Sequence, residues 1–232
     1  MPDDTTFRDR RTALSEAFHA FNQPLTGLHC GLELSLLKER SESEYRERLQ
    51  DALRNAGSIV KLSRALRELV DASDPGEHFG INALEPLLFA LKAQIAPLAE
   101  SKQVSVTIAE CCNSRIKADP TKLLCALGGI LTYLISGLDG DGSIAINVSE
   151  TNRAVVLTLK TLGLNIARIQ DIEAQALEIR RDAGFGYIQT IGGTVKPLAS
   201  GLHLVFPKQR RLQTSLPATR SRTIGSSASR KS

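Results

Sequence analysis

The chain has 232 residues, of which 42% are hydrophobic and 23% are charged, so it can bury one or two cores. It contains no apolar run of the roughly 18 residues that a membrane span needs, and its polar beginning is unlike a signal peptide. Its four cysteines lack the paired spacing of a zinc module or a disulfide framework. A membrane protein, a secreted mini-protein and a zinc module are therefore disfavoured, and we expect a cytoplasmic protein with reduced thiols.

Charge is distributed unevenly along the chain. The net charge is +4, but residues 208–232 alone contain seven basic residues and no acidic one, which leaves −3 for the rest. This basic tail also has few large apolar side chains, so we expect it to be disordered. A nucleic-acid partner is not expected, because no aromatic residue lies among the tail's charges.

Residues 1–76 predict two long helices. Between residues 7 and 40, apolar residues recur at alternating steps of four and three, as in a coiled-coil seam: Leu14, Phe18, Phe21, Leu25, Leu28, Leu32 and Leu36. A second periodic run starts after Ser41, a cap residue followed by acids, and ends at Asp74-Pro75-Gly76. A hairpin of this kind leaves its seam half exposed, so we expect a homodimer whose four helices form a bundle.

From residue 77 to residue 207 the pattern changes to intermixed helices and strands. Helices are expected over 82–101, 120–136 and 169–190, and strands over 104–108, 144–148, 155–159, 194–197 and 202–206. Residues 139–142, Asp-Gly-Asp-Gly, are expected to form a turn, since the glutamate that would complete a calcium loop is missing. This order predicts an α+β two-layer sandwich. The expected domains are thus 1–76 and 77–207, followed by the disordered tail 208–232.

The most informative local pattern surrounds His19. This residue lies one step off the apolar seam, so its side chain should face water. Asn22 and Gln23 follow on the same helix face, and Pro24 crowds the preceding turn and favours a kink. An exposed imidazole beside two amides on a bendable helix suits a nitrogen that accepts and donates a phosphoryl group. The alternative interpretation is an ordinary surface histidine beside a helix kink.

The pattern His19-x-x-Asn22-Gln23-Pro24-Leu25-Thr26 on the first helix of a long hairpin resembles the dimerisation and phosphoacceptor stem of bacterial sensor histidine kinases. Residues 115–123, Arg-Ile-Lys-Ala-Asp-Pro-Thr-Lys-Leu, are similar to the segment leading into the Asn-box helix of that family's ATPase domain. The resemblance covers roughly residues 10–207. It implies that His19 is the phosphoacceptor and that the receiver domain of a response regulator is its partner.

The first departures from the family concern the histidine and the magnesium ligand. Ala20 stands where the family has an acid directly after its histidine. Counted from Asp119, the family's magnesium-binding Asn falls on Tyr133, and an earlier helix Asn falls on Gly129. A phenol is a poor ligand for Mg²⁺, which prefers carboxylate, carbonyl and water oxygens.

Further departures concern the nucleotide. The family's Asp-x-Gly-x-Gly box aligns with residues 161–165, where Thr161 replaces the Asp that reads adenine and Asn165 replaces the second glycine. The later glycine-rich lid is shortened, and Gly184 and Gly186 are either its remnant or part of the last helix. Transfer from ATP depends on positioning and metal electrostatics, so these losses predict a degenerate domain that does not use ATP.

The function predicted from sequence is therefore phosphate exchange between His19 and a receiver Asp, with Asn22 and Gln23 orienting the imidazole or a water. No cofactor or resident metal is expected, because the receiver would bring its own Mg²⁺. This pattern is similar to histidine phosphotransferases with a kinase-like stem and a decayed ATPase domain. Two alternatives stay open: an active autokinase with an atypical site for ATP and Mg²⁺, and a non-enzymatic dimeric scaffold. His29 and Cys30 are expected at the surface or in packing rather than as a metal pair.

Overall fold

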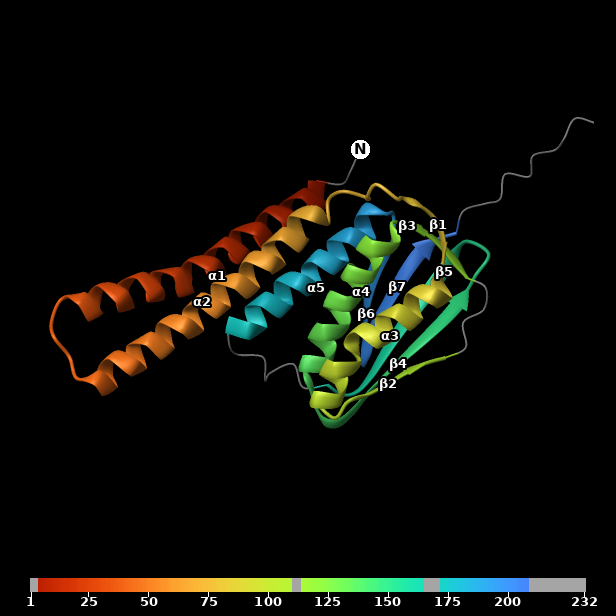
Figure 1. Cartoon of the computed structure of the whole chain (residues 1–232). Helices are drawn as coiled ribbons and strands as arrows, with labels where there is room; N and C mark the ends of the chain where they lie inside the picture. The colour runs from red at the N-terminus through yellow and green to blue at the C-terminus, as the bar shows by residue number, and fades with distance from the viewer. Residues whose placement is uncertain (1–3, 110–113, 165–171, 209–232) are drawn as a thin grey trace, which may run out of the picture.

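The computed structural model describes residues 4–109, 114–164 and 172–208, so residues 209–232 of the expected tail lie outside the described residues. The chain forms a helical hairpin that projects from a sandwich of three helices and a sheet (Figure 1). The predicted α+β class is confirmed. No helix within the described ranges is long and apolar enough to cross a membrane.

The hairpin consists of α1 (Asp4–Leu36) and α2 (Glu42–Asp71). α2 begins with a capping box, in which the Ser41 hydroxyl accepts from the Glu44 N–H at 3.3 Å and the Glu44 carboxylate accepts from the Ser41 N–H at 2.8 Å. The restart predicted after Ser41 is thus confirmed. α1 continues as a helix through Pro24, which is buried.

The sandwich places three helices on one face of a five-stranded sheet (Figure 1). Its elements are β1 (Gly80–Ala83), α3 (Leu84–Ser101), β2 (Ser105–Ile108), β3 (Arg115–Ala118), α4 (Pro120–Ser136), β4 (Leu138–Glu150), β5 (Ala154–Leu164), α5 (Ile172–Thr190), β6 (Thr194–Leu198) and β7 (Gly201–Pro207). The sheet order is β2-β4-β5-β7-β6, in which only β2 and β4 pair in parallel, and β1 pairs separately with β3. Buried aliphatic residues of both layers form the main core.

The seam expected on α1 is only partly buried within the single chain. A second core instead buries the small residues Ala17 and Ala20 of α1, together with Leu62, Ala65, Ala176 and Ile179 of α2 and α5. Small side chains let three helices approach one another closely. Four of the seven expected seam residues are therefore exposed within the chain, by 56, 44, 44 and 87%: Phe18, Leu25, Leu32 and Leu36.

Residues 139–142 do not form the expected turn. They lie inside β4, whose pairing with β5 shifts register between Leu138 and Ser143. Asp141 adopts a left-handed φ of 70°. Such an irregularity adds residues to one strand without ending it, so β4 begins at Leu138 and continues to Glu150.

Candidate functional site

His19 has an exposed side chain on α1, as the register of the apolar pattern predicts. It lines a groove of about 500 Å³ between α1, the end of α2 and α5. Three carboxylates line the same groove, namely Glu16 from α1 and Glu178 and Asp182 from α5. None of the described residues that line the groove is a lysine or arginine, so the imidazole lies in negatively charged surroundings.

The two amides that were expected to assist His19 lie on the next turn of α1 and do not line this groove. Asn22 and Gln23 are exposed on α1, but neither lines the groove. The polar groups that share the groove with His19 therefore come from α5 and from the turn of α1 that precedes the histidine. The role assigned to Asn22 and Gln23 stays a prediction.

α5 is held against the hairpin by apolar packing and by an ion pair. Ile179 is buried against the small residues of α1 and α2. The next residue, Arg180, donates from its Nε to the Glu68 Oε2 of α2 at 2.9 Å, and both side chains are about one-third exposed. Sequence analysis missed this contact because no local pattern pairs residues so far apart in the chain.

α5 also packs tightly against α4, where the resemblance implies nucleotide-binding residues. A Cβ added to Gly129 would lie 2.8 Å from the Arg180 carbonyl oxygen, and one added to Gly184 would lie 2.6 Å from the Ala126 carbonyl oxygen. Only glycine permits the two helices to approach so closely at these positions. Gly184 and Gly186 belong to helix α5 and not to a separate lid, which resolves the alternative left open by the sequence.

Two more positions at which the family binds its ligand are covered. Tyr133 is 7% exposed, and the Arg181 guanidinium lies 4.6 Å from the centre of its ring. Thr161 is 2% exposed, and its hydroxyl has no hydrogen-bond partner within the described part of the chain. Asn165, the other substituted position of the box, lies outside the described residues.

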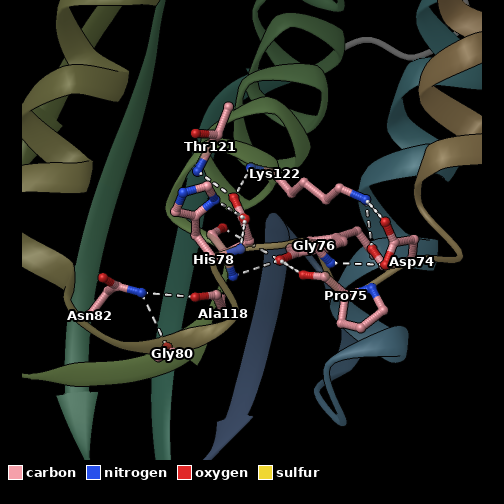
Figure 2. Close-up of polar contacts among 11 residues, drawn as sticks. Asp74, Pro75, Gly76, His78, Gly80, Asn82, Ala118, Thr121 and Lys122 are labelled. Carbon is pink, nitrogen blue, oxygen red and sulfur yellow. Dashed lines mark hydrogen bonds and ion pairs between the residues drawn. The ribbon is translucent and has the colours of Figure 1, made fainter.

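Asp119 ties the linker after the hairpin to the start of α4, and the residues that donate to it, His78, Thr121 and Lys122, are labelled in Figure 2. Its carboxylate accepts from the backbone N–H groups of Thr121 and Lys122, which caps the helix, and from that of His78, at 2.9 to 3.1 Å. Burial alone would raise the pKa of this carboxyl, but the three N–H donors outweigh that effect and hold the pKa below its ordinary value. The start of α4 and the linker are thus fastened to one charged group.

Tyr187 of α5 bridges the same linker. Its hydroxyl donates to the Pro75 carbonyl oxygen at 3.1 Å and accepts from the Asp119 N–H at 3.0 Å. Burial, with the nearby carboxylates of Asp119 and Asp74, raises the pKa of this phenol to about 12, so it stays protonated. Lys122 adds an ion pair with Asp74 at 2.8 Å (Figure 2). These contacts fix the sandwich to the base of the hairpin.

A second group of polar residues lies farther along α1. His29, Cys30 and Glu33 place potential ligand atoms within 4.8 Å of one another, and the His29 Nδ1 lies 3.5 Å from a carboxylate oxygen of Glu33. All three residues are exposed, so His29 and Cys30 lie at the surface, which was one of the two expectations for them.

Solved structures share this fold, although no protein-family model and no curated protein matches the sequence. The Acinetobacter baumannii histidine kinase AdeS is similar with a TM-score of 0.58 and 12% identity, over 82% of this chain and 97% of that chain. Histidine kinase ThkA, in complex with response regulator protein TrrA, is similar with a TM-score of 0.58 and 16% identity, over 87% of this chain and 65% of that chain. The chain therefore has the fold of a histidine kinase catalytic region, as the resemblance implied.

Proposed function

We propose that this chain is a two-component signalling protein that carries phosphate on His19 and exchanges it with a receiver Asp without using ATP. One observation carries the proposal. His19 is exposed beside an open groove, whereas Gly129, Tyr133 and Thr161, which align with nucleotide-binding positions, are packed within the sandwich.

Exchange between a histidine and an aspartate requires little from this chain. The receiver would supply the acidic pocket and the Mg²⁺ that stabilises the transferring phosphoryl group, so the hairpin need only present the imidazole and a docking surface. ThkA, which shares the fold, was solved with a response regulator, and this supports a receiver as partner. A cytoplasmic location belongs to the proposal, because Cys30 and Cys125 are free thiols.

The absence of ATP use rests on the chemistry of the covered positions. Tyr133 offers a phenol beneath a guanidinium where Mg²⁺ would need an open oxygen ligand. Thr161 offers a buried hydroxyl where the family reads adenine with a carboxylate. No cofactor is therefore part of the proposed activity.

We further propose that the functional form is a homodimer. The outer surface of the hairpin carries exposed apolar residues on both helices, including Leu32 on α1 and Leu49 on α2, which are 44% and 63% exposed. Burying the part of each leucine that is still exposed would contribute about 1 to 2 kcal/mol, and a second hairpin would do so in a four-helix bundle. Light scattering should show a dimer that Leu32→Glu with Leu49→Glu separates, while Leu162→Glu, at an exposed leucine of the sandwich, leaves it intact.

The test of the phosphate chemistry is a paired labelling experiment. Wild-type protein and His19→Ala are incubated with labelled ATP and Mg²⁺ in one tube, and with the phosphorylated receivers of the same organism in the other. We expect label on the wild type from at least one receiver, none from ATP, and none on His19→Ala. Labelling by ATP would instead establish the autokinase. Receiver binding without labelling, unchanged in His19→Ala, would establish the scaffold.

A further inference from the structure

One face of α5 supplies polar groups to the histidine groove. Gln175, Glu178, Ile179 and Asp182 are spaced at i, i+3, i+4 and i+7, so they share a helix face, and all four line the groove with His19. Ile179 is buried in the core that joins α5 to the hairpin. The apolar anchor therefore holds its polar neighbours beside the turn of α1 that carries His19.

The charged groups around His19 differ in how they are engaged. Asp182 forms an ion pair with Arg181 at 2.8 Å, so its charge is compensated. Glu16 lies on α1 itself, one turn before the histidine, and α2 contributes only Leu69 to the described lining. Glu178 is exposed, lines the groove, and has no hydrogen bond or ion pair with any residue in the described ranges.

A phosphoryl-accepting imidazole needs an acceptor for its second nitrogen. The neutral ring has one N–H and one lone pair, and the group that accepts the N–H decides which nitrogen is the nucleophile. Ala20 cannot supply that acceptor from the position after His19. Within the groove, the carboxylate that is neither paired nor on the histidine's own helix is Glu178.

We propose that Glu178 is the positioning residue of His19: its carboxylate accepts the Nδ1–H and leaves the Nε2 lone pair free to attack. This inference rests on the proposed function. In the transfer step, the Nε2–P bond forms while the P–O bond of the receiver's aspartyl phosphate breaks, and the aspartate leaves as a carboxylate. The ring's Nδ1 proton moves to Glu178 and then to solvent, and it returns in the reverse direction.

The kinetic test uses phosphoramidate, a small phosphoryl donor, so that it does not depend on finding the receiver. Phosphorylation of His19 is followed by ³¹P NMR in the wild type and in Glu178→Gln, Glu178→Asp, Glu16→Gln and Asp182→Asn. We expect Glu178→Gln to be slower by about 100-fold, the lower range for a positioned proton acceptor. Glu178→Asp should recover most of the rate, and the other two variants should remain within about threefold of the wild type. A Glu178→Gln rate equal to or above that of the wild type would overturn the inference.

A second measurement separates the inference from the proposed function. The chain has four histidines, so ¹⁵N-labelled histidine gives few signals, and His19→Asn identifies the one of interest. At alkaline pH, where imidazole is neutral, the wild type should show the Nδ1–H tautomer at His19, and Glu178→Leu, which removes the acceptor altogether, should shift towards the Nε2–H form. Equal tautomer populations would refute the role of Glu178 even if His19 is phosphorylated. A shift without any phosphorylation would leave the geometry standing and refute the proposed function.

Discussion

The two sides of α5 differ in how they meet their neighbours. Towards α4 the helix is closed, because Gly184 and Gly129 bring the two backbones into contact. Towards α1 it is open, because polar residues such as Glu178 line a groove of about 500 Å³ beside His19. One helix therefore covers the positions that would bind a nucleotide and also forms the wall of the histidine site. Under the proposed function, this one docking of α5 would both exclude the nucleotide and shape the groove of His19.

The packing of α5 against α4 can be disrupted at Gly184, and we expect this substitution to lower the unfolding free energy most. A valine there would meet the Ala126 carbonyl oxygen and the Ile130 side chain, since even a Cβ would lie within 2.9 Å of both. Overpacking of this kind should cost about 3 kcal/mol of unfolding free energy, measured as a lower urea midpoint at constant slope. Gly57→Ala on α2 is the matched control, because nothing lies within 4 Å of its added Cβ. The control should gain about 0.5 to 1 kcal/mol, and equal losses in both variants would contradict the account of α4 and α5 packing.

The orientation of α5 beside the groove of His19 depends on Tyr187, because this residue anchors α5 to the linker. Tyr187→Phe leaves the buried N–H of Asp119 without its partner, so we expect a loss of about 2 kcal/mol in urea unfolding. Tyr45→Phe is the control, since its exposed hydroxyl makes only a 3.5 Å contact with the Lys38 carbonyl oxygen. If the two substitutions cost the same, the linker is not anchored by this hydroxyl.

Acid should weaken the same anchor through Asp119. The pKa of this carboxyl is lowered by folding, so its contribution is complete above the unfolded value of about 4 and is lost as the pH falls through the folded value. Asp119→Asn should flatten this part of the pH profile and cost about 1 kcal/mol at neutral pH, since an amide cannot accept from both sides as a carboxylate does. Unfolding free energies measured between pH 7 and pH 2 test both statements, and an unchanged slope in the variant would contradict them.

The smallest change in unfolding free energy is expected when nucleotide is added. If the α4 and α5 contact excludes ATP, adding about 1 mM Mg²⁺-ATP should leave the unfolding free energy unchanged. A site filled at about 100 times its Kd would add about 2.7 kcal/mol, which thermal or urea unfolding detects easily. A gain of that size would show that the covered positions open in solution.

Local signals predicted much of the fold because they are encoded by neighbouring residues. The Ser41 and Glu44 capping box marked the start of α2, and Asp119-Pro120 marked the start of α4. The exposure of His19 followed from its place beside the apolar pattern of α1. Each of these statements depends on residues within one or two helical turns of one another.

Contacts between distant segments could not be predicted in this way. Periodicity identifies apolar positions but not their partners, so nothing indicated that Ala17 would be buried under α5 while Phe18 stayed exposed. Residues 139–142 resembled a turn because Asp and Gly favour turns, and the same residues also suit an irregular strand. Glu178 carried no motif, and only the docking of α5 brings it to the groove of His19.

The fastened linker has a mechanical consequence. In addition to the Tyr187 bridge, the Thr190 hydroxyl donates to the Ala72 carbonyl oxygen at 2.9 Å, directly where the hairpin ends. A domain that delivers a nucleotide to a distant histidine needs a pivot at such a junction. Here hydrogen bonds from Tyr187 and Thr190 of α5 fasten the junction, so we expect a rotation at the tip of the hairpin to be transmitted to the sheet. Upstream control of this protein would then act on how the hairpin and the sandwich, moving together, meet their partners.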